Sequence, residues 1–331
     1  MLPDCHSDRL SLPCNIGWLV CQPPHRYHGI QLLSFRHRNL PILLPILVVA
    51  TLAACSPRQM VVGSLADELA GQGRGSESDL DLARDASAFY LKLSESVLRS
   101  DPGHRALAES VAGGFTQYAY AFVSFEADRL EAKDARAAER LRRRAAQLYR
   151  RAHQHAMMAL EKNSPGFARA LYAAPGADQP KLLPGQVGLA YWAAAAWGGW
   201  ISLSKDDPEV VADLPQAVRL ANLAWQVDPA WGGGSLTGLL ATFEAARPGG
   251  NQKLALAWFD QAISQGGGSN AGALVGKAEG HALPTGDRVL FDSLLNQAVA
   301  IKDAPDSQQA LANEVMRRRA AWLLEQSPDL F

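Results

Sequence analysis

The chain has 331 residues, which is enough for one large domain or two small ones with a hydrophobic core. Alanine and leucine dominate after residue 80, where β-branched residues are sparse, and this composition favours helix over sheet. The formal net charge of -1 excludes both the basic excess typical of nucleic-acid-binding proteins and the acidic excess of a polyanion mimic.

The cysteines are confined to the first sixth of the chain, at Cys5, Cys14, Cys21 and Cys55. The remaining sequence can therefore hold neither an internal disulfide nor a thiolate metal site.

The N-terminal region has the features of an export signal. Residues 40–54 form an apolar run preceded by Arg36, His37 and Arg38. The run is too short to span a bilayer comfortably, and its charged-then-apolar order is typical of a signal peptide. It ends in Leu-Ala-Ala before Cys55, which resembles the lipobox of bacterial lipoproteins. We predict that residues 1–54 are the signal peptide region and that Cys55 is lipidated; the alternative is an ordinary signal peptide with a chance cysteine.

Two further expectations concern this region. Ser56 follows the cysteine where an aspartate would be an inner-membrane signal, so resemblance to lipoprotein sorting rules predicts the periplasmic face of the outer membrane. Residues 1–32 carry three cysteines and no periodicity, and they would place a long polar stretch ahead of the signal. We interpret them as a misassigned start, with translation beginning near Leu32 or Leu33.

Residues 55–79 are rich in glycine, serine and small polar residues, and are expected to form a flexible tether after the lipidated cysteine. A short piece within it, residues 62–70, has a helical pattern.

From residue 80 to residue 331, helical patterns alternate with short breaks rich in Pro, Gly, Asp and Asn. The first expected helix, Leu80–Arg99, has an apolar stripe at Ala86, Phe89, Leu93 and Val97. The segment Gln186–Ser204 is apolar nearly all round and is expected to be central and buried. The other expected helices are His104–Leu130, Asp134–Lys162, Leu214–Val227, Ser235–Ala246, Gln252–Ser264, Ala271–His281, Asp287–Ala300 and Ser307–Glu325.

Helices joined by such short turns predict an all-α domain at 80–331, a tetratricopeptide-like array of antiparallel helix hairpins. Some hairpins keep the tetratricopeptide spacing, in which a small residue, a bulky one four later and an alanine three later face the neighbouring helix. The matches are Ala145-Tyr149-Ala152, Ala217-Ala221-Ala224 and Ala255-Phe259-Ala262.

Several segments together resemble the T-component family of TRAP-type transporters, which are tetratricopeptide-like periplasmic lipoproteins. The resemblance runs from about Cys55 to Phe331, and its most distinctive parts are the tryptophan-rich block at 191–215 and the ending at 313–331. Further marks lie at 113–131, 148–160 and 286–295. The sequence departs from the family pattern at Gly234-Ser235-Leu236, where a Gly-x-x-His pattern is expected, so a role carried by that histidine would be absent here.

The resemblance implies a homotrimer that holds a periplasmic substrate-binding protein and offers it an internal channel. On this basis the expected function is that of a lipid-anchored periplasmic adaptor of a TRAP-type solute uptake system. Its partners would be the substrate-binding protein and the membrane, reached through the N-terminal lipid, and ligand would pass through a pore. The alternative is a tetratricopeptide scaffold lipoprotein for envelope assembly with no small-molecule ligand.

Candidate contact residues follow from composition and position. Trp192, Trp197 and Trp231 are candidates for ligand, pore or partner contact, although helical spacing favours core packing for most tryptophans of this stretch. Asp287 and Arg288, which lie in one of the marks of the family, line a channel mouth or partner interface in one reading and only cap a helix in the other.

Other kinds of chemistry find no support in the sequence. The basic run from Arg140 to Arg151 is read as a solvated face or as intersubunit ion pairs. His153 and His155 diverge by about 200° on a helix and cannot share a metal ion. We expect no metal, no cofactor, no nucleic-acid partner and no enzyme activity, because carboxylates occur singly at helix caps and no catalytic motif is present.

Overall fold

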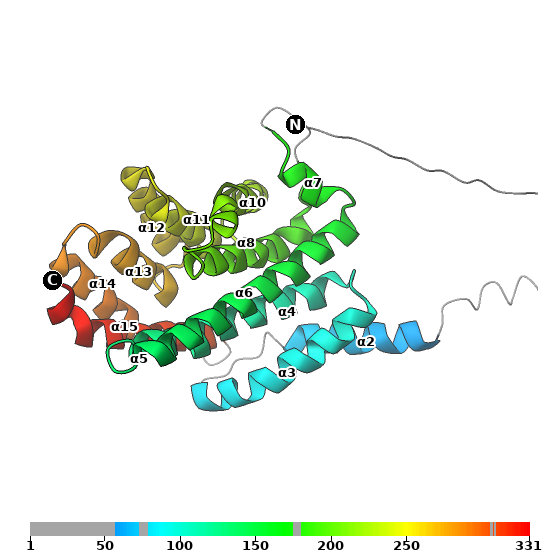
Figure 1. Cartoon of the computed structure of the whole chain (residues 1–331), viewed down its shortest axis with the longest axis horizontal. Coiled ribbons are helices and arrows are strands. Elements are labelled where there is room, and N and C mark those ends of the chain that lie inside the picture. Colours follow the sequence, from blue (N-terminus) through cyan, green and yellow to red (C-terminus); the bar gives the residue numbers. More distant parts are fainter. Residues whose placement is uncertain (1–56, 73–78, 175–179, 305–306, 308) are drawn as a thin grey trace, which may run out of the picture. The chain divides into compact units, whose positions relative to one another are not determined.

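The structure, a computed structural model, describes residues 57–72, 79–174, 180–304, 307 and 309–331. The predicted signal region and Cys55 lie outside the described residues, as do residues 73–78 of the predicted tether. The described part consists of helices joined by turns and contains no strand, which confirms the all-α prediction (Figure 1). Within that part, no helix combines the length and the apolar character needed to cross a membrane.

The helices follow the predicted order with bounds shifted by a few residues. The main ones are α2 (Pro57–Gln72), α3 (Leu80–Ser100), α4 (Arg105–Tyr118), α6 (Ala135–Asn163), α8 (Val187–Ser202), α10 (Leu214–Val227), α11 (Ser235–Ala246), α12 (Gln252–Gln265), α13 (Ala271–Lys277), α14 (Arg288–Ala300) and α15 (Ala310–Leu330). Shorter elements are η1 (Ala119–Ser124), α5 (Phe125–Leu130), α7 (Phe167–Leu171), η2 (Pro184–Gln186), α9 (Pro208–Ala212) and η3 (Ala278–Ala282).

Polar side chains fix several helix starts. The carboxylate or amide oxygen of the residue before the helix accepts a backbone N–H from the first turn, which satisfies a donor that would otherwise have no partner. The residues that cap helices in this way are Asp79, Asp134, Asp207, Asn251, Asn270 and Asp287. These caps are the physical basis of the breaks that the sequence predicts.

Neighbouring helices along the chain pack on one another. In this way α4 packs on α6, α6 on α8, and α8 on α10, while α11 pairs with α12 and α14 with α15. This order is compatible with an array of helix hairpins of the tetratricopeptide type.

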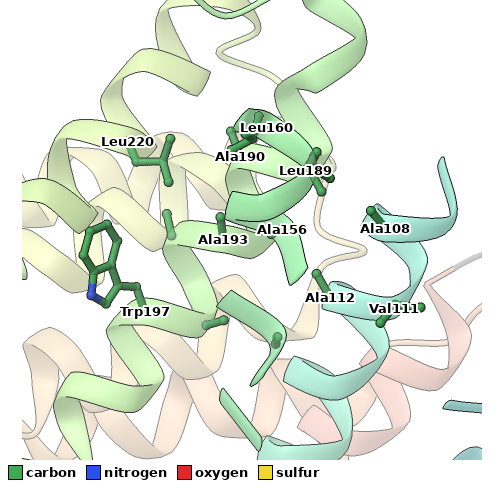
Figure 2. Packing of buried hydrophobic residues seen from close by; sticks show 14 of the residues in the cluster. Ala108, Val111, Ala112, Ala156, Leu160, Leu189, Ala190, Ala193, Trp197 and Leu220 are labelled. Carbon is green, nitrogen blue, oxygen red and sulfur yellow. The ribbon is translucent and has the colours of Figure 1, made fainter. Parts of the chain in front are cut away.

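Helix α8 lies at the centre of the largest core, as its all-round apolar sequence predicts. Figure 2 shows Ala190, Ala193 and Trp197 of α8 among buried residues of α4, α6 and α10. Several α8 side chains are alanine, so neighbouring helix axes can approach it closely.

The small-large-small residues occupy the expected positions between helices. All nine residues of the three matches are buried. A Cβ added at Gly199 of α8 would lie 2.8 Å from the Tyr149 ring, and one added at Gly280 of η3 would lie 2.7 Å from the Phe259 ring. Each aromatic ring therefore occupies space that only a glycine on the facing helix leaves open.

Two expectations for the N-terminal helices are corrected. Within the expected tether, the helical piece is longer than 62–70 and extends over the whole of α2, which packs on α3 and α4 through Ala66, Leu69 and Ala70. The Tyr90 hydroxyl of α3 donates a hydrogen bond to the Leu69 carbonyl. This part of the segment therefore belongs to the helical array.

The predicted apolar stripe of α3 was wrong for most of its residues. Of the four residues, only Val97 is buried, while Phe89 is 75% exposed. The buried face instead contains Leu91, Leu98 and the polar residues Ser94 and Glu95. A charged residue can face inward here because Glu95 accepts hydrogen bonds from basic side chains, as described below.

The segment predicted as a single helix over His104–Leu130 is continuous but not regular. Its middle part, η1, is π-helical, and a second π-helical segment, η3, follows α13. A π turn inserts one extra residue, so it changes which side chains face the neighbouring helices.

We predict that Gly234→Ala destabilises the protein more than Gly267→Ala. Both glycines have positive φ, +89° and +57°, so both alanine variants carry the left-handed strain of about 1–2 kcal/mol. A Cβ at Gly234 would also lie 2.3 Å from the Ala262 carbonyl oxygen, whereas no atom lies within 4 Å of one at Gly267. The clash should add about 1–3 kcal/mol to the loss of unfolding free energy. Urea unfolding of the two variants measures the difference, and equal losses would contradict the close contact between α11 and α12.

Candidate functional site

Two of the predicted contact residues, Trp192 and Trp231, are brought together by a third aromatic residue. The Tyr191 ring lies 4.8 Å from the Trp192 ring and 4.4 Å from the Trp231 ring, centroid to centroid. Trp231 lies in the glycine-rich turn before α11, and it is partly buried like Trp192. Burial raises the pKa of the Tyr191 hydroxyl to about 12. We call these three residues the Trp192–Trp231 cluster.

The third tryptophan, Trp197, is only 1% exposed and forms part of the helix core. Its ring lies 4.3 Å from the His153 ring, and its indole nitrogen has no hydrogen-bond partner among the described residues. Burial lowers the pKa of His153 from 6.5 to about 4, although its hydrogen bond with the Ala193 carbonyl acts in the opposite direction. The imidazole is therefore neutral at pH 7, and its Nδ1–H donates to that carbonyl at 3.1 Å.

Asp287 and Arg288 lie at the start of α14, away from α8 (Figure 1). The Asp287 carboxylate accepts the backbone N–H of Leu290 at 2.9 Å and so caps the helix. Arg288 forms an ion pair with Asp292, with 3.5 Å between Nε and Oδ2. The next residue of α14, Val289, has a side chain that is 83% exposed. The structure thus does not join these two residues to the tryptophans.

A partly buried ion cluster lies where the C-terminal helix α15 meets α5 and η3, and the sequence did not predict it. Arg319 donates to both carboxylate oxygens of Glu279 at 2.6 and 3.0 Å, and to Asp128 at 3.0 Å. Its guanidinium lies over the rings of Tyr120 and Trp322, 5.6 and 5.9 Å from their centroids. The two carboxylates therefore share one cation in a partly aromatic environment, which is a structural arrangement and not an acid–base pair with free oxygens.

Both π-helical segments contribute to this Arg319 cluster. Tyr120 comes from η1 and Glu279 from η3. Burial raises the pKa of the Tyr120 hydroxyl, which donates a weak hydrogen bond to the Met316 sulfur at 3.7 Å. π turns are often found at functional sites. In this region they place the side chains of Tyr120 and Glu279 against the same arginine.

The basic run of α6 makes ion pairs within the chain, where the sequence predicts a solvated face or intersubunit pairs. Arg151 donates two hydrogen bonds to Glu95 of α3, and Arg142 pairs with Asp128 and Glu131. Arg143 pairs with Glu139 on the same helix. At least part of the run therefore joins α6 to its neighbours.

Glu95 is the most enclosed carboxylate of this group, with a side chain that is 3% exposed. Its burial opposes ionisation, but hydrogen bonds from Arg151, Lys92 and His155 outweigh that effect and lower the pKa from 4.5 to about 2. The expectation that carboxylates serve only as helix caps was therefore wrong for Glu95, as it was for Glu279 and Asp128. Arg151 and His155, which bind Glu95, and Arg319, which binds Glu279 and Asp128, lie 40 or more residues away along the chain, so no local signal reveals these contacts.

At the departure from the Gly-x-x-His pattern, the residue three after Gly234 is Thr237. Its hydroxyl donates to the Pro229 carbonyl at 3.0 Å and accepts from the Trp225 indole at 3.1 Å. The buried threonine thus fixes the turn that carries Trp231. Among the described residues, no group of histidine, cysteine and acidic side chains is arranged to hold a metal ion.

Comparison with known proteins gives two findings. The model of a family described as TAtT, TRAP transporter T-component, matches residues 76–331. An uncharacterized protein of Treponema pallidum (strain Nichols) is 26% identical over 302 residues, which cover 84% of this chain and 94% of that protein. The family match spans all the helices from α3 to α15.

We predict that Arg319→Met destabilises the protein far more than Arg318→Ala. Loss of Arg319 leaves Glu279 and Asp128 without their shared cation, which should cost about 3–5 kcal/mol of unfolding free energy. Arg318 is half-exposed and pairs with Glu314 one turn away, so its loss should cost less than about 1 kcal/mol. Denaturant unfolding measures both. Similar small losses would show that the cluster contributes little to stability.

We also predict that Glu95 makes stability depend on acid pH. Because its pKa in the folded chain, about 2, lies below the ordinary value of 4.5, its contribution is full above pH 4.5 and is lost as the pH falls toward 2. The difference corresponds to on the order of 3 kcal/mol. In urea unfolding, the gap between the wild type and Glu95→Gln should narrow from pH 6 to pH 3. The control is Glu139→Gln at an exposed position, for which the difference in unfolding free energy from the wild type should barely change with pH. A difference for Glu95→Gln that stays constant with pH would refute the role of Glu95 in acid stability.

Proposed function

Because the chain belongs to the TRAP transporter T-component family, we propose that it is a lipid-anchored periplasmic adaptor which binds the substrate-binding protein of a TRAP-type uptake system. Family membership makes it a component associated with a TRAP transporter and suggests a place in the cell envelope. The family is an accessory family of transporters and not a family of enzymes. The observation that carries the proposal is that the family match covers the helical array from α3 to the C-terminus.

The anchor in this proposal is Cys55. The lipobox-like sequence before it, and the charged-then-apolar run before that, support acylation after export. Two or three acyl chains hold a protein durably on a membrane, whereas one chain gives only marginal binding. The adaptor would then face the periplasm from the outer membrane, as Ser56 suggests.

The partner surface in this proposal includes the start of α14. Val289 is the most exposed of the large apolar side chains in the described part, and it lies beside Arg288, which is half-exposed. Arginine is among the residues that are enriched where proteins bind one another. Asp287 holds this end of α14 in place through its cap.

In this proposal the ligand contacts the Trp192–Trp231 cluster, while Trp197 packs in the helix core. Aromatic rings provide large rigid contact areas for hydrophobic or organic-acid molecules, which are the ligands that the family resemblance suggests. Passage of ligand through a pore, and assembly as a homotrimer, belong to the same proposal and rest on that resemblance.

The experiment that tests the adaptor role is co-purification with the substrate-binding protein encoded beside a TRAP-type permease. The wild-type adaptor should retain that protein. The double variant Arg288→Glu and Val289→Asp should bind it at least about tenfold more weakly, which corresponds to about 1.4 kcal/mol. The control is Gln297→Glu, an exposed change on the same helix that should leave binding unaltered.

Two outcomes would overturn parts of the proposal. A wild-type protein that never retains a binding protein from membranes would contradict the adaptor role. A native mass spectrum of the complex without any bound small molecule, while the binding protein alone carries its ligand, would favour the scaffold for envelope assembly over ligand transfer.

A further inference from the structure

Helices α2 and α3 carry large apolar side chains that no other described element covers. The exposed fractions are greatest for Phe89 at 75% and Val61 at 67%. When exposed apolar side chains form a contiguous patch, they usually mark a contact with another molecule or with a membrane. We call the set the α2–α3 apolar face; its members are Val61, Leu65, Leu82, Phe89 and Leu93.

The exposed apolar side chains of the two helices lie beside the contact between α2 and α3. On α2, Val61 and Leu65 precede Leu69 at intervals of four, and the Leu69 carbonyl accepts the Tyr90 hydroxyl of α3. The other side of α2 faces the start of α4, where Asp67 lies 3.2 Å from His104. Val61 and Leu65 therefore lie on the α3 side of α2, in the row that Leu69 continues.

On α3, the exposed residues form a separate row. Leu82, Phe89 and Leu93 follow one another at intervals of seven and four, which places them on one side of the helix. Phe89 is the immediate neighbour of Tyr90, which reaches α2. The row thus borders the α2 contact. Because α2 and α3 pack on each other at the N-terminal edge of the array (Figure 1), we treat the two rows as one apolar surface.

The place of Cys55 in the chain indicates what covers this surface. Helix α2 begins at Pro57, two residues after Cys55, so about 7 Å of extended chain at most separates an acylated cysteine from the helix. Val61 follows four residues into the helix, a further distance of about 6 Å. A lipid anchor at Cys55 would therefore hold the exposed row of α2 within the thickness of a headgroup layer.

We propose that the α2–α3 apolar face lies in the interface of the phospholipid bilayer and orients the array on the membrane. The proposal rests on the proposed acylation of Cys55. Helix α2 is apolar on two sides, toward the core through Ala66 and Leu69 and outward through Val61 and Leu65. That pattern suits a helix placed between a protein core and acyl chains, with its apolar side chains inserted below the headgroups.

The test uses single cysteines, which the chain makes possible because no cysteine follows Cys55 and acylation consumes that thiol. The variants Val61→Cys and Phe89→Cys probe the face. Glu68→Cys and Ser96→Cys are matched controls at exposed polar positions of the same helices. Each acylated full-length protein carries a thiol-linked fluorophore and is bound to phosphatidylethanolamine-rich vesicles. Nitroxide-labelled lipid and aqueous iodide serve as the two quenchers.

We expect the labels at positions 61 and 89 to be quenched by the nitroxide lipid at least about threefold more strongly than the controls, and to be protected from iodide. If the protein floats with the vesicles but all four labels are quenched by iodide and none by the nitroxide lipid, the membrane contact is refuted while the lipid anchor stands. The same labels can be measured without lipid in Cys55→Ser protein. If positions 61 and 89 are then protected from iodide, and the protection rises with protein concentration, a second copy of the chain covers the face and the proposal is overturned. A protein that is not acylated and does not float refutes the anchor itself, and with it this inference.

Discussion

The array depends on helices that approach one another more closely than ordinary side chains would allow. Where α6 meets α8, the Tyr149 ring occupies the space above Gly199, and where α4 meets α8, the Trp192 ring lies over Gly113. Helix α12 repeats the arrangement with Phe259 over Gly280. Dispersion between a flat ring and bare backbone is strong only at such short separations. The positions of the aromatic side chains are therefore set first by packing, and any contact they make with a ligand has to use the edges that packing leaves open.

The sequence predicted well those features that local chemistry decides. Caps such as Asp79 and Asn251 mark helix starts, and alanine-rich α8 could be placed in the core because nearly every side chain in it is apolar. The inward face of α3 could not be predicted, because its two rows are similarly apolar. The choice between them depends on Glu95 and its partner Arg151, 56 residues further along the chain.

The candidate site was predictable to a smaller extent. Trp192 and Trp231 share a cluster, but only through Tyr191, and Trp197 serves the core, as helical spacing favoured for most of these tryptophans. The Arg319 cluster escaped prediction because its members come from three distant segments, and because π turns arise from tertiary fit that no local pattern encodes. A member of a transporter accessory family is expected to act through its surfaces. Most of the exposed large apolar side chains of the described part lie on α2, α3, α14 and the C-terminal residues.

The ion pair between Arg319 and Asp128 joins residues 191 positions apart. In an open solenoid each repeat contacts only its neighbours, so the terminal repeats can fray without disturbing the middle. Here the last helix, α15, pairs with α5 and also packs on α3, so it contacts elements that are not its neighbours in the chain. Unfolding from the C-terminal end must break this partly buried ion pair, which couples α15 to the first half of the described helices.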